Sequence, residues 1–356
     1  MRVLHVITAL GDGGPEHQLR LLVDRLPHES EVVTLSPPGA VADALRARGT
    51  TVHEVTGRRG LGAVGALRRL IRRGRFDLVH THVHRACVPG RFAARLAGVR
   101  RVVATEHRLG DTAGRLYLTT ERLGQVTIAA SPAVARRLAE WGVPDERIEV
   151  IPKAVAPGEF GYDPRLRAAA RARLGIAPGA AVVGGVGRLE PGERFDRLIR
   201  AVAEAPGATL LLAGDGPARD ALQKLAAIEG IADRVVFAGR VPHAREMLCA
   251  MDVFASPGED TFGLVVLEAI AAGLPALYAR CPPLEELAAA RATVEGARRL
   301  TPHDRESLPR ALRAELLCLA ERHGERLPAR AAGPRYDADH LAREVDRVYS
   351  RTGPVS

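Results

Sequence analysis

With 356 residues, 46% of them hydrophobic, the chain is long enough for two domains, each with its own core. Only 4% of the residues are aromatic, so stacking platforms for single-stranded nucleic acid are scarce. No run of about 18 apolar residues occurs, so no transmembrane helix is expected. The net charge is +9, and the whole excess lies in residues 1–155, which hold 24 Lys and Arg against 15 Asp and Glu.

Strands and helices alternate through the first half of the chain. Hydrophobic periodicity predicts strands at residues 3–8, 31–35, 51–55, 76–81, 101–105, 126–130 and 148–151. The helices between them are predicted at residues 16–26, 40–48, 62–73, 90–97 and 132–141. This alternation predicts an α/β domain over residues 1–155, built on a doubly wound parallel sheet.

The second half repeats the same alternation after a connection at residues 156–178, which are rich in Pro, Gly, Arg and Ala. Strands are predicted at residues 181–186, 209–213, 235–238, 252–255 and 275–279. Helices are predicted at residues 195–204, 218–229, 244–250, 263–272 and, less regularly, 288–333. We expect a second Rossmann-like domain over 179–335 and an amphipathic C-terminal helix within 336–356. Ligands of such folds bind at the carboxyl ends of the strands.

The chain start and the cysteines bear on the cellular compartment. Met1–Ile7 has the pattern of a core strand and not that of a signal peptide. The four cysteines show neither disulfide nor metal-ligand spacing, so we expect a cytoplasmic protein with reduced thiols.

Basic residues gather in the first half, on and after the predicted helix 62–73. They are Arg68, Arg69, Arg72, Arg73, Arg75, Arg91, Arg95, Arg100 and Arg101. Such a face suits peripheral contact with the anionic inner face of a membrane or with an anionic acceptor. A solvated surface in an Arg-biased chain is the alternative. No aromatic residues interleave the cluster, so nucleic acid is not expected as a partner.

The most informative segment is Met251–Pro275. Asp260 lies in a loop ahead of a helix that Gly263 opens, and Glu268 lies about a turn and a half inside that helix. A helix N-terminus attracts anions, whereas two carboxylates beside it suit sugar or ribose hydroxyls. The segment therefore predicts a nucleotide-sugar site. An ordinary strand–turn–helix with a buried, structural Glu is the alternative.

Three further loops follow predicted strand ends. The glycines of Gly11–Gly14 let the backbone approach a phosphate or sugar, but Pro15 and Glu16 depart from the dinucleotide fingerprint and argue against NAD. Arg188 leaves a strand tip, where it would neutralise a diphosphate leaving group or form a surface ion pair. The loop 213–217 is predicted to be structural, with its Asp capping the next helix.

Histidines also cluster near strand ends. An extended segment would place His80, His82 and His84 on one face, a spacing that raises the question of a metal ion. No carboxylate nearby completes such a site, so no metal is predicted. His107 follows another strand tip, where it is suited to bond a sugar hydroxyl or steer a proton; a capping or surface role is the alternative.

Together these residues resemble the retaining GT-B glycosyltransferases of family 4. The resemblance is strongest from Val186 to Pro275, in the order VGRLEP, LAGDGP, VFAGRV and DVFASPGEDTFGLVVLEAIAAGLP, and continues in HVITALGDGGPEHQL, DLVHTH and ATEH. It implies two Rossmann-like domains that face a central cleft, with a C-terminal helix that crosses back to the first. It also implies transfer of a hexose-type sugar from a nucleotide diphosphate sugar, most often a UDP-sugar, without a metal or other cofactor. The acceptor hydroxyl would belong to a cell-envelope glycan, a lipid-linked molecule or a secondary metabolite.

The resemblance also implies roles for individual residues. Arg188 would bind the diphosphate, Asp260 the transferred sugar and Glu268 the ribose, while His107 would lie near the sugar. The catalytic set is Arg188, Asp260 and His107. The donor-binding set is Gly13, Gly14, Arg188, Arg194, Asp260, Phe262, Gly263, Leu264 and Glu268.

Two positions depart from the family pattern. Asp260 stands where Glu is usual, and Glu193 stands where the family has a Lys that assists the departing diphosphate. Arg194 or Lys153 would have to supply the missing cation. A catalytically weak or silent nucleotide-sugar-binding protein is therefore one alternative function. A nucleotide-sugar epimerase of the same fold is another.

Overall fold

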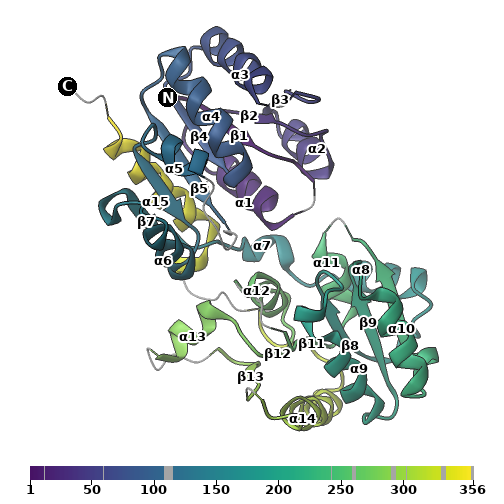
Figure 1. Cartoon of the computed structure of the whole chain (residues 1–356). Coiled ribbons are helices and arrows are strands. Elements are labelled where there is room, and N and C mark those ends of the chain that lie inside the picture. The colour runs from purple at the N-terminus through teal and green to yellow at the C-terminus, as the bar shows by residue number, and fades with distance from the viewer. Residues whose placement is uncertain are drawn as a thin grey trace. The chain divides into compact units, whose positions relative to one another are not determined.

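The computed structural model describes residues 1–11, 13–58, 60–107, 115–241, 243–258, 262–289, 294–301, 303–329 and 334–353. The chain divides into two compact units, shown with their elements in Figure 1. Unit 1 comprises Met1–Ala154 and Ala338–Ser356, and unit 2 comprises Val155–Asp337. Each unit is an α/β fold with a parallel sheet, as the alternating pattern predicts.

In unit 1 the described residues form a seven-stranded parallel sheet in the order β3-β2-β1-β4-β5-β6-β7. Its strands are β1 Arg2–Ile7, β2 Glu29–Thr34, β3 Thr51–Glu54, β4 Leu78–His82, β5 Val102–Glu106, β6 Val126–Ala129 and β7 Ile148–Val150. Its helices are α1 Gly14–Val23, α2 Ala40–Ala47, α3 Leu61–Gly74, α4 His84–Ala97, α5 Arg115–Glu121, α6 Pro132–Glu140 and α15 Ala338–Arg351. Helices α3 and α4 pack on one face of the sheet, and α1 and α2 pack on the other.

In unit 2 the described residues form a six-stranded parallel sheet in the order β10-β9-β8-β11-β12-β13. Its strands are β8 Ala181–Val186, β9 Ala208–Ala213, β10 Val235–Gly239, β11 Val253–Ser256, β12 Ala276–Tyr278 and β13 Ala297–Arg299. Its helices are α7 Pro157–Phe160, α8 Pro164–Arg173, α9 Phe195–Ala203, α10 Arg219–Ile228, α11 Ala244–Ala250, α12 Leu264–Ala271, α13 Pro282–Ala289 and α14 Ser307–Glu321. Apolar side chains from α8, α11 and α12 cover one face, and those from α9, α10 and α14 cover the other.

The predicted connection at 156–178 packs within unit 2. Helix α8 is held there by Asp252, which accepts hydrogen bonds from Arg167 (2.7 Å), Arg171 (2.8 Å) and the backbone N–H of Val182 (2.8 Å). The two guanidinium groups compensate a carboxylate that is buried at the start of β11. This network ties the segment that follows unit 1 to the sheet of unit 2.

The prediction of a helical stretch over 288–333 is wrong in part. Residues 297–299 form β13, an edge strand that pairs with β12 through bonds such as Leu300 N–H to Tyr278 O (2.8 Å). The strand is short and carries Arg298 and Arg299, so its own sequence has no strand periodicity. Pairing with a neighbouring strand decides its conformation.

The C-terminal helix α15 belongs to unit 1. Its predicted apolar face, Leu341, Val345 and Val348, is buried there. Among the described residues, no helix is long and apolar enough to cross a bilayer.

Candidate functional site

Three loops meet at the carboxyl edge of the unit 2 sheet, after β8, β9 and β11. The first two are in backbone contact: Leu189 N–H donates to Asp215 O (3.1 Å) and Ala218 N–H donates to Leu189 O (2.8 Å). The third approaches through Gly258, where a Cβ would collide with the backbone of Gly192 and Glu193. A Cβ on Gly214 would lie 1.8 Å from the carbonyl oxygen of Gly187, so only glycine permits this approach. The loop that carries Arg188 is therefore held in place by its neighbour, and the structural role predicted for the loop 213–217 fits the packing. The Asp215 side chain caps no helix; it accepts from the N–H of Gly216 instead.

Arg188 lies in this loop with its side chain 73% exposed and paired to Glu190 at 2.6 Å. The surface ion pair considered from the sequence is thus present. An exposed pair of this kind contributes little free energy, typically under about 1 kcal/mol. The guanidinium group can therefore exchange its carboxylate partner for a phosphate at small cost.

Helix α12 begins at the same edge of the sheet, after β11, and starts at Gly263 as the sequence predicts. Gly263 precedes it with φ +68°, and a Cβ there would lie 2.4 Å from Cys281 Sγ and 3.0 Å from Cys281 Cα. The first turn of the helix contains no acidic residue, so its free N–H groups are available to an anion. Phe262 and Glu268 are half-buried on either side of this start, and Asp260 lies outside the described residues.

Glu193 and Arg194 follow the Arg188 loop, ahead of α9. The carboxylate of Glu193 faces the backbone of Gly187, where a built Cβ would lie 3.5 Å from its Oε2. Arg194 adopts a left-handed conformation (φ +54°) and its side chain pairs with Asp196 at 3.2 Å. The cation next in sequence to Glu193 is therefore engaged with the first turn of its own helix.

In unit 1 the structure brings Gly14, His107 and Lys153 together. The Lys153 side chain is buried, and its Nζ would lie 4.0 Å from a Cβ built on Gly14. Lys153 and His107 line one small pocket together with Gln18 and His82. Gly13 caps the start of α1 immediately beside this group, where a Cβ would collide with the Glu16 carboxylate at 2.2 Å.

His107 is electrically neutral at physiological pH. Burial, reinforced by the positive charge of Lys153, lowers its pKa from 6.5 to about 3. Neither ring nitrogen has a hydrogen-bond partner within the described part of the chain. A group with this pKa is a poor proton carrier near pH 7, so hydrogen bonding fits His107 better than proton transfer does.

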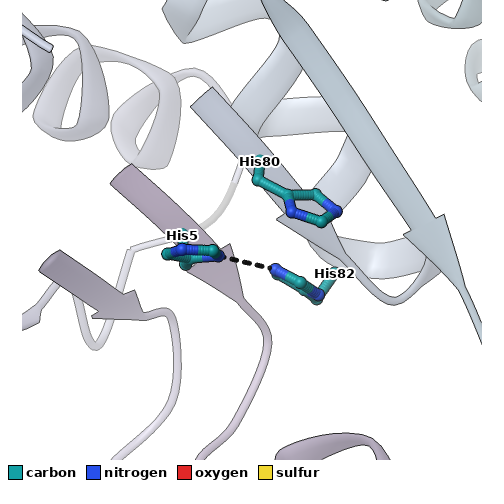
Figure 2. A group of neighbouring side chains, drawn as sticks. All are labelled: His5, His80 and His82. Carbon is teal, nitrogen blue, oxygen red and sulfur yellow. Dashed lines mark hydrogen bonds between the residues drawn. The ribbon is translucent and has the colours of Figure 1, made fainter. Parts of the chain in front are cut away.

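The expectation that His80, His82 and His84 share one extended face is wrong. Val83 has φ +70°, which ends the strand, and His84 already belongs to α4, where its ring stacks on Tyr117 at 4.4 Å. The third histidine of the cluster is His5 and not His84. Figure 2 shows its ring, on β1, beside those of His80 and His82 on β4. Sequence periodicity could not find His5, because pairing between distant strands creates the cluster.

The sequence patterns also did not predict a cluster of buried polar side chains around Glu106, the last residue of β5. Glu106 is fully buried and accepts a hydrogen bond from the Cys87 thiol (3.2 Å). Arg91, predicted as part of a basic surface, is itself buried, with its guanidinium 4.7 Å from the centre of the Tyr117 ring. Burial raises the pKa of Glu106 from 4.5 to about 7. The carboxyl group is therefore half protonated near neutral pH.

Replacing Glu106 by Gln should make the protein relatively more stable as the pH rises. In the wild type the stabilising effect of the raised pKa is complete below pH 4.5 and is lost as the pH rises through 7. Gln cannot ionise, so the variant avoids a decrease of up to about 3 kcal/mol in the free energy of unfolding. Urea unfolding of both proteins at pH 5 to 8 measures the difference. The exposed Glu140→Gln control should show no trend, and parallel wild-type and Glu106→Gln curves would contradict the prediction.

Two models of known protein families match this chain. Residues 13–159 match the family model described as Glycosyltransferase Family 4, and residues 180–317 match the one described as Glycosyl transferases group 1. The two matches together span most of both units.

Two curated relatives illustrate the sequence similarity. The D-inositol 3-phosphate glycosyltransferase of Nocardia farcinica is 37% identical over 237 residues, which cover 61% of this chain and 49% of the relative. A GDP-mannose-dependent alpha-(1-6)-phosphatidylinositol monomannoside mannosyltransferase of Mycolicibacterium smegmatis is 35% identical over 210 residues, 52% of this chain and 54% of the relative. The chain thus matches about half the length of each of these relatives.

Solved structures of other proteins superpose on this chain over nearly its whole length. Anabaena HepE in complex with UDP-glucose superposes with a TM-score of 0.78 at 23% identity, covering 99% of this chain and 100% of that one. WaaG, a glycosyltransferase involved in lipopolysaccharide biosynthesis, superposes with a TM-score of 0.64 at 17% identity, covering 99% and 100%. At such identities the likeness establishes the GT-B fold.

Proposed function

The chain belongs to glycosyltransferase family 4, and on that premise we propose that it is a retaining enzyme that moves a hexose-type sugar from a nucleotide diphosphate sugar to an acceptor hydroxyl. One observation carries the proposal: the Arg188 loop and the start of α12 lie at the same edge of the unit 2 sheet. There the guanidinium of Arg188 and the first N–H groups of α12 offer positive charge to a diphosphate.

In the proposed reaction the acceptor oxygen attacks the anomeric carbon from the side of the leaving group. The carbon–oxygen bond to the diphosphate breaks, and a new one forms to the acceptor on the same face. The departing phosphate oxygen takes the acceptor proton, so no protein nucleophile is needed. The protein contributes positioning and stabilises the charge that develops on the diphosphate. Asp260 and His107 would bond the transferred sugar, and Glu268 the ribose.

The relatives suggest which substrates to test first. HepE is described in complex with UDP-glucose, and one relative is described as GDP-mannose-dependent, which supports these two nucleotide sugars as donors. Two relatives act, by their names, on inositol phosphate or phosphatidylinositol mannoside. An anionic acceptor of that kind would suit unit 1, which holds the excess positive charge.

Turnover of each nucleotide sugar by the purified chain, with and without inositol phosphate acceptors, tests the proposal. Release of nucleoside diphosphate and a product with the donor's anomeric configuration, by NMR, are expected. Full activity in EDTA is also expected, because the proposed chemistry needs no metal. Donor binding without turnover would favour the silent binding protein, an epimerised donor would favour the epimerase, and an inverted product would exclude retention.

Glu193→Lys should raise kcat/KM on the order of tenfold, because it reverses the charge beside the Arg188 loop. Glu193→Gln, which only removes the negative charge, should give a smaller gain. Steady-state kinetics with saturating acceptor measure both variants. Arg194→Ala serves as the comparison: an unchanged rate for Glu193→Lys together with a large loss for Arg194→Ala would indicate that Arg194 already supplies the cation.

Contact with an anionic membrane is proposed for the exposed arginines of α3. Arg68, Arg69, Arg72 and Arg73 all lie on its solvent side. Changing Arg72 and Arg73 to Gln should weaken binding to phosphatidylserine vesicles about 30-fold, at about 1 kcal/mol for each arginine near the surface. Vesicle cosedimentation measures the effect. The Arg343→Gln, Arg347→Gln double variant removes the same charge from α15, and equal binding by both double variants and the wild type would exclude the α3 contact.

A further inference from the structure

Three histidines from neighbouring strands converge inside unit 1. His5 pairs in register with His80, and His82 lies two residues further along β4, so all three rings project from the same face of the sheet. Figure 2 shows the rings directed toward one another, with the bond between His5 Nδ1 and His82 Nε2 (3.1 Å) drawn as a dashed line. The ring centres of His80 and His82 are 4.0 Å apart. All three side chains are buried.

The cluster has the chemistry of a metal site that lacks charged ligands. All three rings are buried, and a neutral imidazole offers one nitrogen lone pair as a ligand. Among the described residues, a ligand atom from each ring lies within 4.8 Å of those from the other two. His5 Nε2 has no hydrogen-bond partner in the same described part, although it is fully buried. Hydrogen bonding within the protein therefore leaves the cluster incompletely satisfied.

We propose that His5, His80 and His82 bind one divalent first-row transition-metal ion, with zinc the best match, through one nitrogen of each ring. Neutral imidazole is a preferred ligand of this class of ion. In a tetrahedral zinc site, with bonds of about 2.0–2.1 Å, ligand nitrogens are about 3.4 Å apart. The 3.1 Å between His5 Nδ1 and His82 Nε2 is already close to that spacing, and the unpaired His5 Nε2 is the alternative ligand atom of that ring. The ligand nitrogen of His80 lies within 4.8 Å of those of the other two rings, and to bind the ion His80 has to release its hydrogen bond to Tyr349 or to Thr105.

Groups around the triad can support the ligands. His80 shares hydrogen bonds with the Tyr349 hydroxyl (2.7 Å) and with Thr105 Oγ1 (2.7 Å). When one of its nitrogens turns to the ion, the hydroxyl on the other nitrogen orients the ring, as second partners of metal-bound histidines do. The bound ion would then connect β1 and β4, and through Tyr349 also α15. We therefore expect the ion to stabilise unit 1.

One member of the triad, His82, also lines a pocket. His82 lines the small pocket that also contains His107 and Lys153, with the ring centres of His82 and His107 6.5 Å apart. We expect a water in this pocket to serve as the fourth ligand on the His82 side of the ion. The triad belongs to unit 1 and the proposed diphosphate contacts belong to unit 2, so no residue is shared between them and metal binding here is compatible with a transfer reaction that needs no metal.

Calorimetric titration of the EDTA-treated full chain with ZnCl₂ tests the site. One equivalent per chain is expected, and Co²⁺ should give the strong visible absorption of a four-coordinate site. His5→Gln and His82→Gln should each weaken zinc binding at least tenfold. Tyr349→Phe, which changes no ligand, should weaken it about 10-fold or more. His84→Gln is the matched control and should bind as the wild type does, because His84 stacks on Tyr117 outside the triad.

Absence of stoichiometric zinc binding to the folded wild type would overturn the proposal. So would undiminished binding by a folded His82→Gln variant, which would point to histidines elsewhere in the chain. If the His variants do not fold, the Co²⁺ spectrum of the wild type and the effect of Tyr349→Phe decide the question. Zinc at about 100 times its Kd should also raise the Tm by about 5 °C or more in the wild type and not in His82→Gln. None of these readouts depends on transferase activity, so a failed transfer assay leaves the metal proposal intact.

Discussion

Arg188→Ala is expected to lower kcat/KM for sugar transfer by a factor of about 10² to 10³, the usual cost of removing one donor that stabilises developing charge. The guanidinium lies at the carboxyl edge of the unit 2 sheet, in a loop that backbone contacts with Gly214 and Asp215 hold in place. Its resting partner, Glu190, is half-buried and can be exchanged for a diphosphate. Because charge accumulates on the diphosphate as the bond breaks, most of the loss should appear in kcat.

Steady-state kinetics with both substrates varied measure this effect, and thermal unfolding checks that the fold is unchanged. Arg200→Ala is the matched control, since Arg200 is also exposed and paired with a carboxylate but lies on α9. It should change kcat/KM by less than about twofold. Arg188→Lys should keep part of the activity, because it retains the charge but loses the planar fork. Turnover by Arg188→Ala equal to that of the wild type would exclude the diphosphate role.

Gly263→Ala is expected to destabilise unit 2 by about 2–4 kcal/mol and to reduce transfer at least 10²-fold. Gly263 has φ +68°, which strains any residue with a Cβ, and that Cβ would collide with both the thiol and the backbone of Cys281. Relief of the collision has to displace the start of α12. The helix would then present its first N–H groups to the wrong position.

Gly175→Ala separates the effect of backbone strain at positive φ from the effect of the collision with Cys281. Gly175 has the same φ of +68° and also lies in unit 2, but no heavy atom lies within 4 Å of its built Cβ. Its replacement should cost only the backbone strain, about 1 kcal/mol, and leave transfer unchanged. Calorimetric unfolding should show a fall of about 5–15 °C in the unit 2 transition for Gly263→Ala and a smaller one for Gly175→Ala. Equal shifts in the two variants would contradict the collision with Cys281.

Much of the proposed diphosphate site could be predicted from the sequence because its signals are local. A strand, a turn and a helix within 25 residues put Gly263 at a helix start, and a strand end put Arg188 at the carboxyl edge. Parallel strands share that edge, so both had to lie at it once they were assigned to one sheet, whereas only the observed strand order places β8 next to β11. Turn glycines such as Gly214 could be located in the same way, although their closeness to Gly187 could not.

The rest depended on contacts between segments far apart in the chain. His5 reaches His82 across the pairing of β1 with β4, and Lys153 reaches Gly14 across unit 1. Burial of Glu106 beside Cys87, and the turn at Val83 that removes His84 from the histidine face, are likewise products of packing.

Periodicity and turn residues by themselves therefore determined the two α/β units and the strand ends that carry Arg188 and Gly263, because hydrophobic period and glycine conformation act over a few residues. Tertiary structure alone decided the histidine triad, the neutral His107 and the half-protonated Glu106. Strand register and burial bring distant side chains into one low-dielectric environment, and these quantities have no local signature in the sequence.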